Sequence, residues 1–408
     1  MTSDGQSAPS RLDGALRFLL IATIAFLTLV DLFATQVIIP GLTQRYGVSP
    51  ATMGAAVSAC TFGMAAASLG VALFSDRIDR RLGIILSLAV LAVPTVLLAW
   101  APTVGIFAAL RVVQGLCMAT AFSLTLAYLG ERMTGGAATQ AFGAYVTGNV
   151  ASNLIGRFVA SGVAGHWGID ASFHLFAALN LAGAALVAGT IHRSPKMKLG
   201  VDHARSPLKA VLTHLANPRL RAGFVFGFCI LFVFIGVFTF VNFELGGERF
   251  GLSMMTLGSV YFVFLPSILT TAQAGSLATR IGLRPATWTG ISLALIGVGL
   301  MALNALPALL TGMALVAVGT FLAQALATGF VSRAAMGDRA AASGLYLASY
   351  FSGGLVGAVV LGQVYTRAGW NAMLLAVAVA LCLAGILARS FVLPTMTDAA
   401  LRKAPKGT

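Results

Sequence analysis

The feature that most constrains this sequence is a series of long apolar runs, separated by short polar stretches. A helix needs about 20 consecutive apolar residues to cross the hydrocarbon core of a bilayer. The composition agrees, because 58% of the residues are hydrophobic and only 9% are charged. A soluble domain carries about 25% charged residues. We therefore predict an all-α membrane protein with twelve transmembrane helices, at approximately 17–39, 51–74, 83–101, 104–129, 138–163, 172–192, 221–243, 253–275, 285–304, 307–331, 340–364 and 370–392.

Two motifs of the first half of the chain recur in the second half. GVALFSDRIDRR at 70–81 corresponds to AGSLATRIGLRP at 274–285. YVTGNVASNLIGR at 145–157 corresponds to YLASYFSGGLVGA at 346–358. Repeats of this kind build membrane proteins in which a central site opens to either side in turn. We predict two six-helix bundles and a linker: an amino-terminal bundle (1–192), a cytoplasmic linker (193–220) and a carboxy-terminal bundle with a short cytoplasmic tail (221–408).

The net charge of +14 indicates membrane topology rather than binding of nucleic acid. Most of the 26 Lys and Arg residues fall in the termini, the linker and every second predicted loop. Short loops rich in Lys and Arg stay in the cytoplasm, so both termini are predicted to be cytoplasmic. The first apolar run is too long for the core of a signal peptide, and no small-residue cleavage site follows it.

Nothing in the sequence predicts a cofactor, a metal site or an enzyme. The four cysteines lie in separate apolar runs and indicate neither a disulfide framework nor a metal cluster. No GxxxxGK[ST] pattern occurs, so ATP is not expected to drive the protein directly. A membrane-embedded transferase would need paired acidic metal ligands or a His, Asp and Glu set at the membrane face, and neither is visible. A channel is disfavoured because two bundles build one central site.

Three motifs resemble those of a known family. The loop at 70–81 follows the pattern G-x-L-a-D-r-x-G-r-k, although Ala72 and Asp79 replace its two glycines. The run at 104–129 contains R-x-x-Q-G, and the run at 138–163 contains part of G-x(8)-G-P-x(3)-G-G, with Arg157 at the proline position. These motifs resemble the major facilitator superfamily, and within it the twelve-helix drug/proton antiporter branch, over nearly the whole chain. TQVIIP at 35–40 resembles a bacterial inner-membrane, sugar-efflux-like branch.

The resemblance implies a monomeric, multi-pass transporter of the bacterial inner membrane that exchanges protons for a small molecule. It also implies a brace between the bundles at the cytoplasmic surface, which breaks when the inside opens. Interface anchoring by these charges is the simpler alternative. The predicted cytoplasmic gate consists of the charged residues of both repeat copies: Asp76, Arg77, Arg80, Arg81, Arg280 and Arg284.

Asp31 and Arg111 are the ionisable residues that we expect to couple transport to protons. Each lies about eight residues from the outer end of its helix, or about 12 Å deep at 1.5 Å per residue. A charge at that depth is costly and usually faces a partner or a water-filled cavity. We predict that Asp31 carries the proton and Arg111 modulates it; a static ion pair that only holds helices together is the alternative. Thr28 and Thr35 share a helical face with Asp31 and are expected to line the cavity.

The run at 138–163 carries two adjacent stripes. Tyr145, Asn149, Asn153 and Arg157 recur every four residues and form a polar ridge, which we expect along the transport path. A buried network that fixes this helix against its neighbours is the alternative reading. The second stripe, of small residues from Gly148 to Ala160, is suited to close helix packing.

The remaining predicted cavity residues lie mostly in the carboxy-terminal half. The predicted substrate cavity as a whole consists of Thr28, Thr35, Gln114, Tyr145, Asn149, Asn153, Arg157, Asn242, Tyr261, Gln324, Tyr346 and Tyr350. The expected partners are a small-molecule substrate, protons and the lipid bilayer. Because two buried arginines outnumber one buried aspartate, a sugar or organic anion carried by antiport or facilitated diffusion is the alternative to proton-driven efflux.

Overall fold

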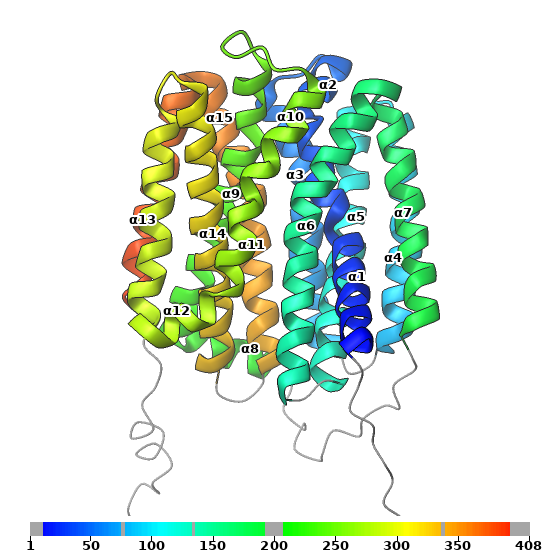
Figure 1. Ribbon diagram of the computed structural model, residues 1–408, viewed down its shortest axis with the longest axis vertical. Coiled ribbons are helices and arrows are strands. Elements are labelled where there is room, and N and C mark those ends of the chain that lie inside the picture. The colour runs from blue at the N-terminus through cyan, green and yellow to red at the C-terminus, as the bar shows by residue number, and fades with distance from the viewer. Residues whose placement is uncertain (1–10, 75–77, 133–134, 192–206, 336–338, 392–408) are drawn as a thin grey trace, which may run out of the picture.

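The computed structural model describes residues 11–74, 78–132, 135–191, 207–335 and 339–391, and these residues form helices and short connections without strands (Figure 1). The first half contains α1 (Arg11–Val37), α2 (Ile39–Tyr46), α3 (Pro50–Phe74), α4 (Arg80–Leu97), η2 (Leu98–Trp100), α5 (Val104–Arg132), α6 (Gly135–Trp167) and α7 (Ile169–Thr190). The second half contains α8 (Pro207–Ala216), α9 (Pro218–Gly246), α10 (Met254–Val260), η3 (Tyr261–Phe264), α11 (Leu265–Ala272), α12 (Ala274–Ile281), α13 (Leu283–Met301), α14 (Leu306–Ala334) and α15 (Arg339–Ala388).

The predicted twelve transmembrane helices are present. Ten stretches of the described chain are long and apolar enough to cross a membrane. One of them, α15, consists of two helices that meet at Gly369, where φ is 81°. A positive φ is readily adopted by glycine, which has no Cβ to clash with the backbone. The 33-residue helix α6 supplies the remaining span.

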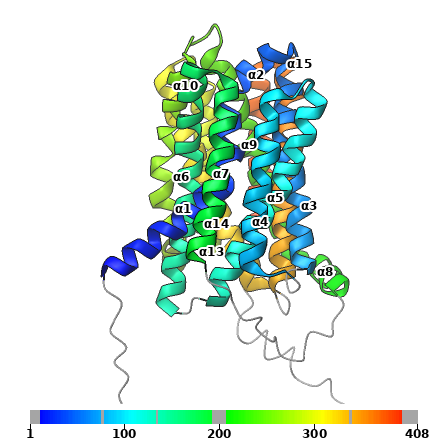
Figure 2. The ribbon, with the colours of Figure 1, turned by 90° about the vertical axis from the view of Figure 1, so that its right-hand side faces the viewer.

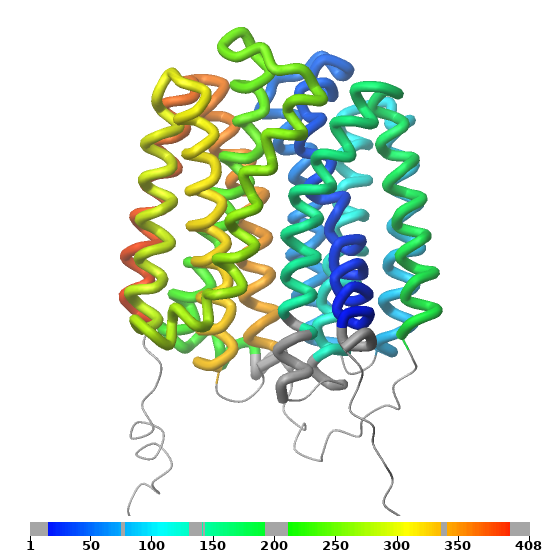
Figure 3. Tube along the Cα trace, viewed as in Figure 1, coloured from blue at the N-terminus to red at the C-terminus, as the bar shows by residue number. Residues whose placement is uncertain are grey.

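The two halves of the chain form two bundles that stand side by side (Figure 1). In the tube view, α1–α7 run from blue to green in one bundle, and α9–α15 run from green through yellow to red in the other (Figure 3). We call the end at which α1 begins and α15 ends the terminal side, and the opposite end the far side. The bundles meet along α3 and α15 over much of their length, and along α6 and α10 near the far side.

The repeat seen in the sequence performs the same task in both bundles. Arg81 donates from Nε to the carbonyl oxygen of Ile191 (2.6 Å), at the end of α7. Arg284, at the corresponding position, donates from Nε to the carbonyl oxygen of Arg389 (2.8 Å), just beyond α15. Helix carboxyl ends carry carbonyls without intrahelical donors, which a cation satisfies well. Each arginine therefore fastens the last helix of its own bundle.

The turns before these two arginines differ from each other, because Asp79 replaces a glycine of the motif in the first copy and Gly282 retains it in the second. Asp79 caps α4, because its side chain accepts a hydrogen bond from the backbone nitrogen of Leu82 (2.8 Å). Gly282 occupies the corresponding place before α13 and has φ of 92°. A side-chain cap in one copy and a left-handed glycine in the other both start a helix.

Three short helices were not predicted, and one lies in the predicted linker. α2, α8 and α12 contain ten or fewer residues each, too few to span a bilayer. α8 occupies 207–216 of the linker and lies beside the terminal side of the bundles (Figure 2). The next spanning helix, α9, begins at Pro218, where Asn217 caps it through a hydrogen bond from the Arg219 nitrogen.

Glycine permits very close packing of α3 and α5. A Cβ atom added to Gly115 would lie 1.8 Å from the carbonyl oxygen of Cys60, and one added to Gly63 would lie 2.0 Å from that of Val112. Small residues at helix interfaces are the usual means by which membrane helices approach each other. This contact brings Arg111, one turn before Gly115, against the backbone of α3.

We predict that Gly115→Ala destabilises the protein because the added methyl group forces α3 and α5 apart. Overpacking of this kind costs about 1–3 kcal/mol, and it should lower the apparent melting temperature in detergent by several degrees. Gly70→Ala, in the neighbouring helix α3, is the matched control, since nothing lies within 4 Å of a Cβ atom at Gly70. Equal melting temperatures for the two variants would contradict the packing argument.

Candidate functional site

A cavity of about 710 Å³ lies between the two bundles and extends toward the terminal side. The bundles contribute α1, α3, α5 and α6 on one side and α9, α11, α14 and α15 on the other. At the middle of the molecule the cavity ends on a layer of apolar residues: Leu32, Phe33, Leu231, Phe234 and Phe321. Phe33 and Phe234 belong to different bundles and contact each other edge to face at 6.3 Å. This layer separates the cavity from the far side.

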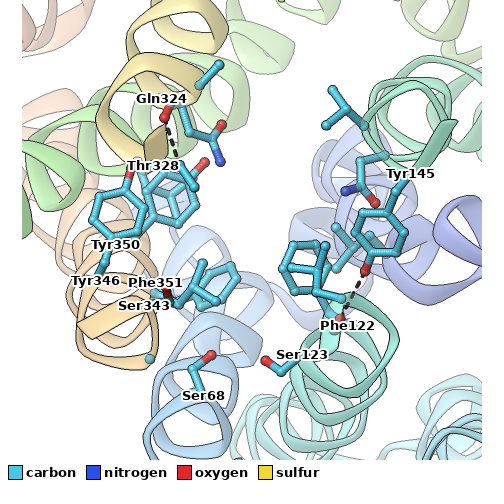
Figure 4. Close-up of a pocket in the computed structure, with 18 of the residues that line it drawn as sticks. Ser68, Phe122, Ser123, Tyr145, Gln324, Thr328, Ser343, Tyr346, Tyr350 and Phe351 are labelled. Atoms are coloured by element: carbon cyan, nitrogen blue, oxygen red, sulfur yellow. Dashed lines mark hydrogen bonds between the residues drawn. The ribbon is translucent and has the colours of Figure 1, made fainter. Parts of the chain in front are cut away.

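Aromatic rings cover much of the cavity walls (Figure 4). Tyr346 and Tyr350 stack on one wall with ring centroids 6.1 Å apart. On the opposite wall Tyr145 packs against Phe122 at 5.3 Å and donates its hydroxyl hydrogen to the Phe122 carbonyl oxygen (3.2 Å). Gly227 leaves room for the Tyr346 ring, since a Cβ atom there would lie 2.6 Å from it. The cavity can thus hold a ligand between aromatic faces from both bundles.

Several polar atoms of the cavity walls have no hydrogen-bond partner among the described residues. They include Ser68 Oγ, Ser123 Oγ and Asn149 Oδ1 on the amino-terminal side and Thr271 Oγ1 on the carboxy-terminal side. Buried polar atoms are normally paired with protein or water. None of the described residues that line the cavity carries a charge. The walls therefore offer hydrogen bonds, but no ion pair, to a solute.

Asp31 lies outside this cavity, inside the amino-terminal bundle. Its side chain is 3% exposed. Oδ1 accepts hydrogen bonds from Thr95 Oγ1 (3.3 Å) and Gln114 Nε2 (3.4 Å). Oδ2 has no hydrogen-bond partner among the described residues. Asn180 of α7 donates to Thr95 (3.2 Å) and so closes a polar cluster between α1, α4, α5 and α7.

Arg111 joins this cluster without forming an ion pair with the Asp31 carboxylate. The ion pairs within the described part of the chain include Arg45–Asp170 and Arg249–Glu244, but not these two residues. Its guanidinium instead binds five acceptors on α1, α3 and α5: Val57 O (2.9 Å), Cys60 Sγ (3.0 Å), Asp31 O (3.2 Å), Thr35 Oγ1 (3.2 Å) and Gln114 Oε1 (2.7 Å). Gln114 thus connects the arginine to the carboxylate.

Arg157 lies in a second polar cluster, on the far side of the Phe33–Phe234 layer. The side chain is fully buried and donates to Gln36 Oε1 of α1. It also donates to the carbonyl oxygen of Phe238 in the other bundle (3.4 Å). Its guanidinium carbon lies 4.0 Å from the centre of the Tyr261 ring.

The predicted cavity residues divide between these three places. Tyr145, Asn149, Gln324, Tyr346 and Tyr350 line the cavity. Thr28, Thr35 and Gln114 do not line the cavity as predicted, because their side chains are buried inside the amino-terminal bundle. The face of α1 that lines the cavity consists of Leu29, Leu32 and Phe33. Four others lie on the far side, outside the cavity: Asn153, Arg157, Asn242 and Tyr261.

The predicted gate residues that the structure describes bind different groups. Asp76 and Arg77 lie outside the described residues. Arg81 and Arg284 bind helix ends within their own bundles. Arg80 donates to the carbonyl oxygen of Ile78 (3.3 Å), and Arg280 is exposed in the last turn of α12.

Sequence reasoning missed the hydroxyl groups of the cavity and the partners of the charged residues. Ser68, Ser123 and Thr271 lie in apolar runs that each contain several other Ser or Thr residues, and such residues are typical of packing positions in membrane helices. Gln36 and Asn180 are uncharged and carry no repeat signal. A check of every amide within a predicted helix would have found these two.

We predict that Arg111→Lys strongly destabilises the protein, because one ammonium group cannot reach five acceptors on three helices. Loss of a partner in a buried charged network costs about 3–5 kcal/mol, which should lower the apparent melting temperature far more than Arg219→Lys. Arg219 is exposed at the start of α9 and serves as the matched control. A normal melting temperature for Arg111→Lys would show that these hydrogen bonds do not hold the bundle.

The fold and sequence place the chain among known proteins. It is 25% identical over 384 residues to the uncharacterized MFS-type transporter YybF of Bacillus subtilis, covering 90% of this chain and 92% of that protein. A shorter region, 30% of this chain and 29% of the relative, is 31% identical to the 4-hydroxybenzoate transporter PcaK of Pseudomonas aeruginosa.

Solved structures agree in fold. A bacterial homolog of the human lysosomal transporter Spinster, in an inward-facing and unoccupied conformation, superposes with a TM-score of 0.72 at 15% identity. The match covers 94% of this chain and 98% of that one. The family model of the Major Facilitator Superfamily matches residues 21–265, more than half of the sequence. The chain is therefore a member of the Major Facilitator Superfamily, a multi-pass membrane transporter of small molecules.

Proposed function

We propose that this protein exports a small molecule from the bacterial cytoplasm in exchange for protons, by alternating access. The observation that carries the proposal is the cavity between the bundles, which adjoins the helix that bears a buried carboxylate. The loop positions of Lys and Arg favour a cytoplasmic terminal side in the inner membrane. The present conformation then corresponds to the inward-open state. One chain encloses the whole cavity, which favours a monomer as the transporting unit.

The cavity walls favour a cargo with an aromatic or apolar body and a few hydrogen-bonding groups. Rings from both bundles face the cavity, and several polar atoms without a partner in the described structure lie among them. Apolar pockets with a few polar groups bind ligands of that character. The uncharged lining argues against recognition of the cargo by a direct ion pair in this state.

Asp31 is the proposed proton carrier, and it acts from outside the cargo cavity. Oδ2 has no partner in the described structure, so a proton can bind there without displacing a hydrogen bond. Leu32 and Phe33, the next residues of α1, line the cavity. Rotation or bending of α1 would therefore affect both the carboxyl group and the cargo. Arg111 and Gln114 hold the other side of the carboxyl cluster in place.

We predict that Asp31→Asn abolishes uphill transport driven by a pH gradient, because the amide cannot bind and release a proton near neutral pH. Cargo exchange at equal pH on both sides should persist. The measurement is accumulation of a cargo in inverted vesicles with and without a pH gradient. Glu248→Gln is the control, since Glu248 is exposed on the far side. Gradient-driven accumulation by Asp31→Asn would exclude the proposed role.

We also predict that Ser123→Trp abolishes cargo binding, because the indole would fill space between the cavity walls. Binding of lipophilic aromatic compounds to purified protein, measured by isothermal calorimetry, should fall at least about tenfold, a loss of about 1.4 kcal/mol. Val113→Trp is the matched control: it is on the same helix, but its side chain is 40% exposed on the outer surface. Unchanged binding by Ser123→Trp would mean that the cargo binds elsewhere.

A second candidate function is transport of an aromatic carboxylate. Two observations favour it: Arg157 has no acidic partner among the described residues, and a stretch of the chain resembles a 4-hydroxybenzoate transporter. A panel of cationic, neutral and anionic aromatic compounds in the same vesicles distinguishes the candidates. Counterflow of aromatic acids without neutral or cationic cargo would favour this function over the first.

A further inference from the structure

We propose that Arg157 is the gate residue of the far side: its guanidinium, supplied by one bundle, is held by groups of the other bundle and keeps that side closed. The proposal concerns the change between open states and does not depend on the identity of the cargo or the coupling ion.

The contacts of Arg157 cross the boundary between the bundles. On its own side, α1 supplies Gln36 Oε1 as an acceptor and the Phe33 ring at 5.8 Å. The other bundle supplies the Phe238 carbonyl oxygen at 3.4 Å and the faces of three rings. The centres of these rings lie 4.0 Å (Tyr261), 5.7 Å (Phe264) and 5.8 Å (Phe238) from the guanidinium carbon.

The neighbouring side chains reinforce the same connection. Tyr261 donates its hydroxyl hydrogen to the Phe238 carbonyl oxygen (3.1 Å) or the Asn242 amide oxygen (2.7 Å). Asn242 in turn donates from Nδ2 to the backbone carbonyl oxygen of Gln36 (3.1 Å), in the other bundle. Ser161, one turn beyond Arg157 on α6, packs against Gly258 of the other bundle, where an added Cβ atom would lie 1.7 Å from Ser161 Oγ. The bundles are therefore in direct contact around the guanidinium.

This arrangement compensates the charge only while the far side is closed. A buried cation needs partners because transfer from water is costly. Carbonyl dipoles and ring faces supply them here, and most belong to the carboxy-terminal bundle. When the bundles separate at this level, Arg157 loses those partners and must be solvated instead. Opening therefore requires water or solute to enter as the contact breaks.

The position of Arg157 on α6 also fits a gate. Asn149 lines the cavity, and Arg157 lies two turns further toward the far side on the same ridge. Between them Asn153 is fully buried, and neither polar atom of its amide has a hydrogen-bond partner in the described structure. A polar track thus leads from the cavity to the guanidinium. In the second copy of the repeat, Ala358 occupies the position that corresponds to Arg157, so the carboxy-terminal bundle has no second arginine there.

The test measures the distance between the bundles on the far side by electron–electron double resonance. Cys60, Cys117, Cys229 and Cys382 are replaced by serine, and spin labels are attached at Gln44→Cys and Glu248→Cys, which are exposed on opposite bundles. A second pair, Leu82→Cys and Thr279→Cys, reports on the terminal side.

Arg157→Met should raise the ratio of far-open to far-closed molecules at least about tenfold, within the usual range of coupling between sites. The terminal-side distance should shorten in the same molecules. Arg249→Met is the matched control, because Arg249 binds Glu244, Leu303 and Asn304, all within its own bundle, and should leave both distances unchanged.

Either of two results with Arg157→Met would overturn the proposal. Unchanged far-side distances in Arg157→Met would show that the contact does not hold the side closed. A broadened far-side distribution without terminal-side shortening would mean that Arg157 serves packing alone. If Arg157→Met does not fold, Tyr261→Leu removes the ring nearest the guanidinium and must give the same paired shift; its failure to do so also overturns the proposal.

Discussion

The rest of this structure depends on one constraint: polar groups inside the hydrocarbon must find their partners within the protein. The constraint explains why the buried ionisable residues do not stand alone. Asp31 and Arg111 are enclosed by hydroxyl, amide and carbonyl groups of one bundle. Arg157 is enclosed by groups of both bundles. The Asp31–Arg111 cluster can move as a unit with its bundle, whereas the contacts of Arg157 with the other bundle break when the bundles separate.

Polar atoms that have no partner in the described structure are available to bind water, a solute or a proton. Those at the cavity, such as Ser123 Oγ and Asn149 Oδ1, can be satisfied by water or by a solute that enters between the bundles. Asp31 Oδ2 is separate from the cavity, and a proton is the smallest partner that it can gain. In the exchange that we propose, cargo and proton bind at different places that share helix α1. Exchange of one for the other then requires a change in the position of that helix.

The two halves share their architecture but not their chemistry. Arg81 and Arg284 fasten the last helix of each bundle in the same way. In contrast, Arg157 corresponds to Ala358, and the carboxy-terminal bundle contributes mainly rings and carbonyl groups to the cluster around Arg157. The amino-terminal bundle thus supplies the charges, and the other bundle supplies surfaces that hold or release them.

Much of the fold could be predicted from the sequence, because a run of about 20 apolar residues has few stable alternatives in a bilayer. Interruptions and short helices were harder to predict. The 3₁₀ turn at 261–264 lies within a run that the sequence predicts as one helix, and α8 is too short to be recognised by its apolar length. The four-residue spacing of Tyr145 and Asn149 predicted one shared face, and both line the cavity. The same argument misplaced Thr28 and Thr35, because periodicity shows which residues share a face but not what that face contacts.

The most direct test of the account is to record pH inside proteoliposomes loaded with an aromatic cargo that binds the cavity, with no pH gradient imposed at the start. If the protein exchanges cargo for protons, the cargo that leaves down its own gradient draws protons inward, and the lumen acidifies in proportion to the cargo lost. Cargo loss at the same rate without any change in luminal pH would contradict the account and indicate facilitated diffusion.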